Sequence, residues 1–546
     1  MKNQPRCLAG LLATSLWVVA LVAADDDNPS PAEQRAAVHW VAQEVATARV
    51  LDAVAQRAVR GPVLYRDISV VDVKQFRVVP HQSVLVADGK IAWVGDAAAA
   101  PVGEGAFVVE GAGLYLSPGL VDMHVHLSNL SEHLLHLACG NTTVRDMDGF
   151  PWILRLRRAT QAGRLLAPTA YISGTIIAEL DWGGYMIPVK TPAEARRVVD
   201  QEVADGYDFI KVHNRLRESL FDAVAEEARL KGKDLVGHVP HGISIDHAVH
   251  AGHMRTLEHL KGFIDDGTKK VSGEDYAAAL KDATVWLTPT FTSEIKVFST
   301  GDAAMRQLAR PEMRYVSATK RANWERDANP APDWRARLKQ AVPSFLAPKT
   351  IGERAIASLP EAMARLLPLH PRWLAGTDSA GYNFQIPGYD LLEELLVMEK
   401  MGIARADVLR SVTTEPAIAL RHEGEFGEVQ IGQRADFVVL AGDPTKDLSR
   451  YHANRGVMVR GIWLDRTNLD SALEELARIK SEADEAFTLD GPKAAALAAE
   501  VQQLAARDIF LDPMELRPAV EGLRQLGFAA AAEKLQAVVS ESAKLK

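Results

Sequence analysis

This chain of 546 residues is poor in cysteine and has no long basic run. Its formal charge is −9, which argues against a nucleic-acid binder that works through an electrostatic footprint. Its only two cysteines, Cys7 and Cys139, are too few for a fold stapled by disulfides. Hydrophobic residues make up 47% and charged residues 24%, which excludes a mainly disordered chain. At about 150 residues per domain, the length favours several units.

The amino-terminal apolar stretch, 8–24, is short for a membrane span of about 20 residues. Two basic residues precede it, and three aspartates begin at Asp25. A basic head, an apolar run and small residues at its end predict a signal peptide over 1–24, cleaved after Ala24, and therefore export to the periplasm or the extracellular space. A membrane anchor is the alternative. The exported chain would retain only Cys139, so no internal disulfide could form, and a large core or a bound metal would have to stabilise it.

After this segment, the residue pattern changes several times. Helical spacing over 31–60 predicts an amphipathic helix within an N-terminal segment, 25–61. Short β-rich runs fill 62–118 and return over 423–466, including Phe426-Gly427-Glu428-Val429, and Asp88-Gly89 predicts a hairpin turn. We expect these two stretches to form one composite β-sandwich domain.

The middle of the chain, 119–422, alternates apolar runs with helical segments. The eight expected strands are 120–127, 142–147, 168–177, 208–214, 235–240, 255–260, 285–291 and 372–379. Thr191-Pro192-Ala193-Glu194 predicts a helix start, and Gly140 a helix end. The fold class we predict is α/β, a (β/α)8 TIM barrel inserted in the small β-sandwich domain. A doubly wound open sheet is the alternative, although no glycine-rich phosphate loop follows any of these strands.

Two further stretches are additions to this pattern. The long segment 292–370 between the last two strands is predicted to be a lid insertion. The C-terminal extension, 467–546, is rich in Ala, Leu, Glu and Lys and predicted to be helical, with breaks at Asp490-Gly491-Pro492 and Asp512-Pro513.

Histidines at the ends of predicted strands point to metal chemistry. His124 and His126 lie two apart in the first strand, so both face the same side. His238 and His259 end two later strands, and imidazole is the commonest protein ligand of zinc-like metals. The carboxyl ends of barrel strands are where such enzymes build their sites. A His-x-His pair alone is weak evidence, because two histidines can simply line a barrel.

Two charged residues also occupy unusual places. Asp378 follows the last apolar strand, where a buried carboxylate needs a cation or hydrogen-bond donors. Lys211 lies inside a β-rich run, where it either pairs with an acid such as Asp208 or is chemically modified into an anionic ligand. His247, His250 and His253 are more simply explained as surface or packing residues.

The chain resembles the metal-dependent amidohydrolase superfamily, most closely its imidazolonepropionase-like and Xaa-Pro dipeptidase-like branch, over about 62–466. The residues that carry the resemblance are Ser117-Pro118-Gly119-Leu120-Val121-Asp122-Met123-His124-Val125-His126, Phe209-Ile210-Lys211-Val212, Val236-Gly237-His238, Leu257-Glu258-His259, Ala375-Gly376-Thr377-Asp378-Ser379, Thr414-Glu415-Pro416-Ala417 and Gly432-Gln433-Arg434-Ala435-Asp436-Phe437. Each motif is modest, but their order is specific.

The resemblance implies a centre of two divalent metal ions, usually zinc. His124, His126 and Asp378 would hold the first ion, and His238 and His259 the second, with Lys211 bridging them as a carbamate. Two divalent ions with a carbamate, Asp378 and a hydroxide leave a net charge of about +1, which attracts a carbonyl oxygen. Asp378 would act as the catalytic general base and then acid.

The function that this resemblance implies is an exported hydrolase of amide, cyclic amide or small peptide C–N bonds. A lactonase or phosphotriesterase-like ester hydrolase is the runner-up, and a non-catalytic metal-binding protein a third possibility. His213 and His241 are candidate substrate contacts, and any of four arginines could bind a substrate carboxylate: Arg145, Arg215, Arg217 or Arg255. We expect a small-molecule or short peptide substrate, no nucleic acid, and no stable membrane span once the signal is cleaved; a homo-oligomer is compatible with the sequence.

Overall fold

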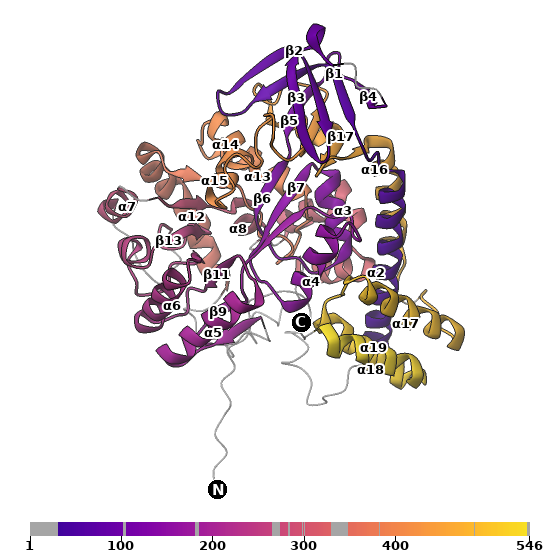
Figure 1. The fold of residues 1–546 in the computed structure, drawn as a ribbon. Helices are drawn as coiled ribbons and strands as arrows, with labels where there is room; N and C mark the ends of the chain where they lie inside the picture. The colour runs from indigo at the N-terminus through magenta and orange to yellow at the C-terminus, as the bar shows by residue number, and fades with distance from the viewer. Residues whose placement is uncertain are drawn as a thin grey trace.

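The computed structural model describes residues 31–101, 105–180, 185–264, 273–281, 284–297, 299, 301–328, 348–381, 383–484 and 486–542. The predicted signal peptide lies outside these residues, as does part of the segment 292–370. The fold is mixed α/β, with a mainly antiparallel sheet beside two parallel sheets that are covered by helices (Figure 1). No helix within the described ranges has the length and apolar character needed to cross a membrane.

The mainly antiparallel sheet has eight strands from two distant parts of the chain. Its early strands are β1 (Val63–Asp72), β2 (Arg77–Ala87), β3 (Lys90–Asp96), β4 (Phe107–Glu110) and β5 (Tyr115–Pro118). Its late strands are β16 (Phe437–Leu440), β17 (Asn454–Val459) and β18 (Ile462–Asp465), and β16 pairs antiparallel with β5. The predicted hairpin turn is confirmed, because Asp88 and Gly89 join β2 and β3 with φ values of 50° and 74°.

One predicted strand in this sheet is wrong. Phe426 forms an isolated β-bridge with Glu423, and 427–429 are bends. Gly427 has a φ of 97°, and such a left-handed conformation interrupts an extended strand.

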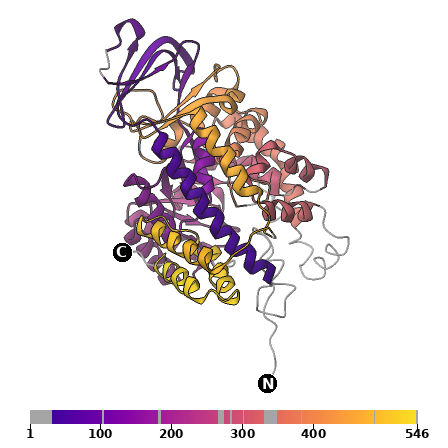
Figure 2. The same cartoon turned by 90° about the vertical axis from the view of Figure 1, so that its right-hand side faces the viewer.

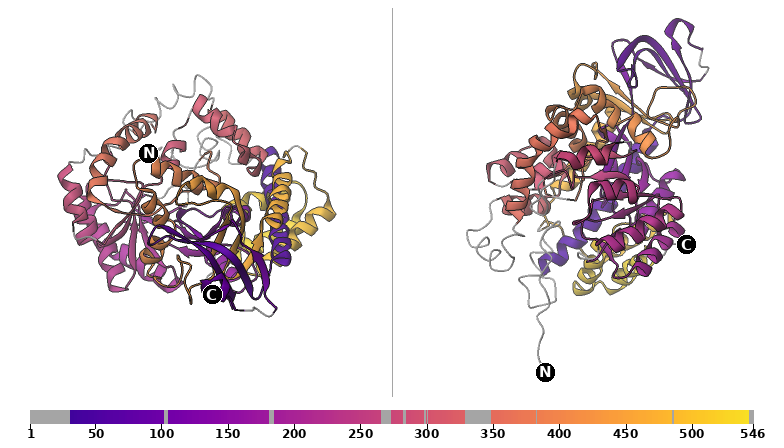
Figure 3. Two further views of the ribbon diagram at one scale, coloured as in Figure 1. Left: turned by 90° about the horizontal axis from the view of Figure 1, so that it is seen from above. Right: turned by 90° about the vertical axis from the view of Figure 1, so that its left-hand side faces the viewer.

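The parallel strands follow the predicted order. A three-stranded sheet holds β6 (Leu120–Val125), β7 (Asn141–Asp146) and β8 (Thr169–Ile172). A seven-stranded sheet holds β10 (Met186–Pro188), β9 (Ile176–Ala178), β11 (Phe209–Val212), β12 (Asp234–Gly237), β13 (Met254–Glu258), β14 (Trp286–Thr288) and β15 (Arg372–Trp373). The run predicted as one strand over 168–177 is therefore split into β8 and β9. Figure 3 shows the helices arranged around these strands.

Backbone hydrogen bonds connect the two parallel sheets at both edges. On one side, Gly174 N donates to Phe209 O at 2.8 Å. On the other, Met123 N donates to Ala375 O at 2.9 Å and Asp378 N to His124 O at 2.7 Å, so the pairing continues beyond the end of β15. This arrangement is consistent with a barrel of β-α units.

Helices follow most of the parallel strands. They are α3 (Leu130–Ala138), α4 (Pro151–Gln161), α5 (Pro192–Asp205), α6 (Glu218–Leu230), the π-helix η2 (His247–Ala251), α7 (Gly273–Leu280), α8 (Phe291–Val297), α12 (Pro348–Leu366), α13 (Tyr389–Lys400), α14 (Arg405–Ser411) and α15 (Thr414–Ala419). The predicted start of α5 is confirmed, because the Thr191 and Glu194 side chains form a capping box. Gly140, with a φ of 90°, follows the end of α3 as expected.

The two helical extensions pack against each other. The N-terminal helix α2 (Pro31–Arg57) contacts α16 (Arg466–Ser481), α17 (Gly491–Ala506) and α18 (Pro513–Gln525), and α19 (Ala529–Ser542) completes the group (Figure 2). Asp490 and Asp512 cap α17 and α18, so the predicted breaks are helix starts. The buried Glu44 carboxylate of α2 lies 3.2 Å from Lys480 Nζ and accepts a 2.7 Å bond from Leu130 N at the start of α3. The extensions thereby support the first helix that follows a parallel strand.

Burial of two histidines on α3 predicts an acid-sensitive fold. Burial lowers the pKa of His133 to about 4 and, with His133 beside it, that of His136 to about 3. The unfolded chain takes up these protons near pH 6.5 and the folded chain does not, so the free energy of unfolding falls as the pH drops below 6.5. Each histidine removes up to about 1.4 kcal/mol per pH unit.

Replacing one of these rings tests this effect. In His133→Leu, the loss of unfolding free energy between pH 6.5 and pH 5 should be about 2 kcal/mol smaller than in the wild type, measured by urea denaturation at both values. The control is His250→Leu, because the His250 side chain is 42% exposed. Equal losses in the wild type and His133→Leu would contradict the prediction.

Candidate metal centre

The predicted ligands lie where parallel strands end. His124 is on β6 and His126 directly follows it, Lys211 is on β11, His238 and His259 follow β12 and β13, and Asp378 lies beyond β15. Two glycines make this approach possible. A Cβ on Gly376 would lie 2.7 Å from His124 Cβ, and one on Gly237 would lie 2.2 Å from Val212 O. The glycines of the Val-Gly-His and Ala-Gly-Thr-Asp motifs are therefore required for close packing beside the ligands.

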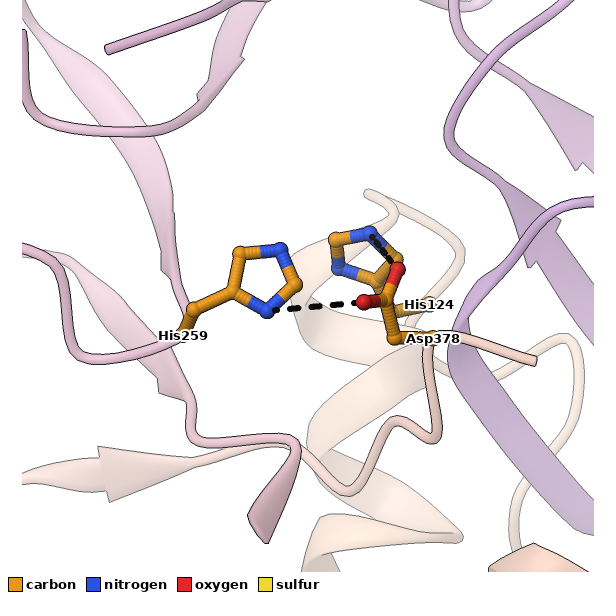
Figure 4. Close-up of side chains that lie close together, drawn as sticks. All are labelled: His124, His259 and Asp378. Atoms are coloured by element: carbon orange, nitrogen blue, oxygen red, sulfur yellow. Dashed lines mark ion pairs between the residues drawn. The ribbon is translucent and has the colours of Figure 1, made fainter. Parts of the chain in front are cut away.

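The Asp378 carboxylate is surrounded by imidazoles. Its Oδ1 lies 3.2 Å from His124 Nε2, and its Oδ2 lies 3.9 Å from His259 Nδ1 (Figure 4). Oδ1 also lies 2.9 Å from His126 Nε2. Burial by itself would raise the pKa of Asp378. The neighbouring charges of His259 and His124 and the hydrogen bonds from His124 and His126 outweigh that effect and hold the pKa well below its usual range. Asp378 is therefore an anion in a buried site.

The distances suit a bound divalent ion. His124, His259 and Asp378 are all buried, and one potential ligand atom from each lies within 4.8 Å of the others. Two ligands of a tetrahedral zinc ion lie about 3.4 Å apart, since each is about 2.1 Å from the metal. The contacts of Asp378 Oδ1 with His124 and His126 are close to that separation.

The environment of His238 is a separate observation that favours metal binding. Its Nδ1 is buried and has no hydrogen-bond partner in the described structure, and its ring centroid lies 4.8 Å from that of His259. Burial, together with His213 and His259, lowers the pKa of His238 well below its usual value, so the ring is neutral. A buried nitrogen without a partner costs stability, and a metal ion would satisfy it.

Lys211 points into the same group. Its side chain is 1% exposed, and Nζ lies 3.4 Å from His124 Nε2. Burial lowers the pKa of the amine, although the charges of Glu258 and Asp378 act in the opposite direction. Asp208 instead pairs with Arg157 at 2.6 Å and accepts a bond from Ile172 N. The alternative in which Lys211 pairs with Asp208 is therefore wrong.

The structure adds the carboxylate of Glu258 to the site, a residue to which the sequence pattern gave no role of its own. Glu258 Oε2 lies 2.8 Å from His124 Nδ1, and Glu258 Oε1 accepts bonds from Arg145 Nη2 at 2.8 Å and Thr256 Oγ1 at 2.5 Å. Since a carboxylate only accepts, His124 Nδ1 donates to Glu258, which leaves Nε2 as the ring nitrogen that faces Asp378 and the site. The signal in the sequence was a carboxylate inside an apolar strand, which needs a buried partner.

Several candidate substrate contacts have other roles. Arg145 is buried and bonded to Glu258, Thr256 and Met123 O, so it cannot bind a substrate. Arg255 stacks on Trp286 and donates to Ile418 O. Arg217 pairs with Glu179 at the surface. Each of these three guanidinium groups already has a partner within the fold.

Of the remaining candidates, His213 lies beside a proposed metal ligand. The His213 ring lies 4.7 Å from that of His238, and burial, with Lys211 and Arg215 nearby, lowers its pKa well below the usual value. His241 is exposed and its backbone N donates to Asn214 O. His247 belongs to a separate, exposed group with Glu218 and Asp222.

Comparisons with known proteins give a family match and similar folds. The sequence pattern of the Amidohydrolase family matches residues 115–477. An adenine deaminase of Paracoccus denitrificans (strain Pd 1222) is 39% identical over 84 residues, which is 15% of this chain and only 14% of that protein.

Two solved structures share the fold. Bottromycin amidohydrolase has a TM-score of 0.61 and 23% identity, over 82% of this chain and 98% of that one. A Xaa-Pro dipeptidase with bound methionine in its active site has a TM-score of 0.57 and 19% identity, over 74% of this chain and 100% of that one.

Proposed function

Because the chain belongs to the amidohydrolase family, we propose that it is a metal-dependent hydrolase of amide, cyclic amide or small peptide C–N bonds. The observation that supports this most directly is the buried group of His124, His259 and Asp378, with the partnerless His238 Nδ1 beside it. The family match covers residues 115–477, which include every one of these side chains.

We propose two zinc ions as the resident metals. His124, His126 and Asp378 would hold the first ion, and His238 and His259 the second. Lys211, as a carbamate, would bridge the two ions. Lys211 Nζ lies 3.4 Å from Nε2 of His124, a proposed metal ligand, which supports a role at the metals. An unmodified ammonium has no lone pair to offer a metal, so this role requires the carbamate.

The chemistry then divides between the metals and the protein. Bound divalent ions lower the pKa of water towards about 7 and polarise a substrate carbonyl. Asp378 accepts the proton of the attacking water and passes it to the leaving nitrogen, as base and then acid. Glu258 orients His124 through Nδ1, so that the ring keeps the correct tautomer.

We interpret the parallel strands as a closed (β/α)8 barrel inserted in a β-sandwich domain. The three strands β6–β8 and the five strands β11–β15 would form its eight-stranded wall, joined by the hydrogen bonds at both edges. The domain boundaries given above remain predictions.

The proposed substrate is a small molecule or a short peptide. A Xaa-Pro dipeptidase that shares the fold supports the peptide option. His213 and His241 remain proposed substrate contacts, since both are near the carboxyl end of β11 or β12.

A substrate panel separates the possible functions. The zinc-loaded protein should hydrolyse members of a set of amides, cyclic amides and dipeptides faster than matched lactones and phosphotriesters. Preference for the esters would favour the lactonase or phosphotriesterase alternative. Firm metal binding without any turnover would favour the non-catalytic alternative.

We also propose that part of the segment 292–370 is a lid. Its described helices include α9 (Asp302–Leu308) and α10 (Ala318–Ala328), and α10 lies against the loop after Asp378, where Trp324 packs on Phe384 at 5.5 Å between ring centroids. At its end, α12 places Leu359 and Met363 in the same apolar core as the parallel strands, so α12 lies outside the proposed lid.

Replacing 302–347 by a short Gly/Ser linker should change the substrate profile while zinc content stays the same. The physical reason is that this segment follows a parallel strand on the side where the ligands lie. The measurement is kcat/KM over the panel, with total zinc per chain as the control. An unchanged ranking of substrates would remove the lid from the proposal.

We propose export as well, from the amino-terminal pattern alone. Amino-terminal sequencing of the protein from its host should find Asp25 as the first residue, and an intact Met1 would refute cleavage.

A further inference from the structure

A short segment after β14 contacts two of the proposed metal ligands. Thr290 Oγ1 lies 2.7 Å from His259 Nδ1, and Ser293 Oγ donates to Asp378 Oδ2 at 3.0 Å. Both residues are at least 98% buried. Thr290 has a φ of 49°, which is rare for a β-branched residue and is kept only where the surroundings impose it. The segment is therefore held in a specific conformation beside the site.

Helix α8, which carries Ser293, is attached to α13 at both ends. At its start, Phe291 N and Thr292 N donate to the buried Glu394 carboxylate at 2.9 and 2.7 Å. At its end, Lys296 Nζ contacts Asp390 at 2.7 Å and Glu393 at 2.6 Å. These charge-assisted bonds leave α8 little freedom to shift, so the position of the Ser293 hydroxyl is fixed.

The two oxygens of Asp378 have different surroundings. Oδ1 faces His124 and His126, whereas Oδ2 accepts the Ser293 hydrogen bond. Rotation of the carboxylate would exchange the two oxygens, and the bond from Ser293 opposes that rotation. A carboxylate that both binds a metal and moves a proton needs a fixed orientation.

We propose that Ser293 is a positioning residue for Asp378, and that α8 sets the orientation of this carboxylate for metal binding and proton transfer. The inference rests on the proposed function for its catalytic part. Its metal-binding part depends only on Asp378 being a ligand.

The test compares hydroxyl-removing and hydroxyl-keeping variants of the full-length protein. In Ser293→Ala, the zinc dissociation constant measured by chelator competition should rise about tenfold, and kcat should fall about 10- to 100-fold with KM within about twofold. Ser293→Thr keeps a hydroxyl and should stay within about threefold of the wild type in both. Ser293→Val, which matches Ser293→Thr in size but has no hydroxyl, should resemble Ser293→Ala in zinc affinity and in kcat.

The matched control is Ser299→Ala, since the Ser299 hydroxyl donates to Ile295 O within the same segment and not to a ligand. It should behave as the wild type. Wild-type zinc affinity in Ser293→Ala overturns the proposal, and so does Ser293→Thr impaired as strongly as Ser293→Ala. If the wild type hydrolyses nothing in the panel, the proposed function fails, and the zinc affinities still decide the role of Ser293.

Discussion

Changing Asp378 to asparagine should reduce kcat by about 10²- to 10⁴-fold, because the variant removes the group that moves the proton. The amide has almost the same shape as the carboxylate but cannot accept a proton at neutral pH. It also removes the anion that the neighbouring imidazoles surround, so the first metal should bind more weakly. The measurements are turnover on the best substrate of the panel and metal content after dialysis.

The control for this variant is Asp470→Asn, the same change at a carboxylate that is 63% exposed on α16 and pairs with Arg466. It should keep metal and activity. Asp378→Asn with activity near the wild type would remove the proton-transfer role. Metal analysis that finds fewer than about two firmly bound divalent ions in the wild type would remove the two-metal centre.

Removing the Lys211 side chain should have the second large effect. The proposed carbamate forms when the neutral amine attacks carbon dioxide, which makes an N–C bond and releases a proton. Burial lowers the pKa of this amine and so favours the neutral form that the reaction needs. Lys211→Ala should lose the bridging oxygens, and with them most of the bound metal and at least about 10²-fold in kcat.

Added carboxylic acids provide the diagnostic readout for Lys211→Ala. Formate, acetate or propionate should restore part of the activity, because a small carboxylate can fill the gap and supply two oxygens. Lys231→Ala is the control, since Lys231 pairs with Asp200 at the surface. Full metal content and normal turnover in Lys211→Ala would make the bridging role wrong.

Much of the framework could be predicted because its signals are local. Apolar runs at regular intervals located the parallel strands, and the Asp-Gly hairpin, the capping box and the helix breaks were each confirmed. The failed strand at 426–429 contains Gly427, whose left-handed backbone a periodicity argument does not detect. Local patterns are reliable where backbone preferences agree with them and fail where a glycine adopts a turn.

Local sequence patterns were enough to place His124, Lys211, His238, His259 and Asp378 at or near the ends of strands, because a strand's direction and period place these residues without any knowledge of their neighbours. The residues that contact these ligands from distant parts of the chain follow from tertiary packing alone. Glu258 meets His124 across 134 residues of sequence, and Ser293 meets Asp378 across 85. Tertiary packing also brought the N-terminal helix α2 against the C-terminal helices. Such contacts depend on how distant segments pack, and no periodicity within one segment encodes them.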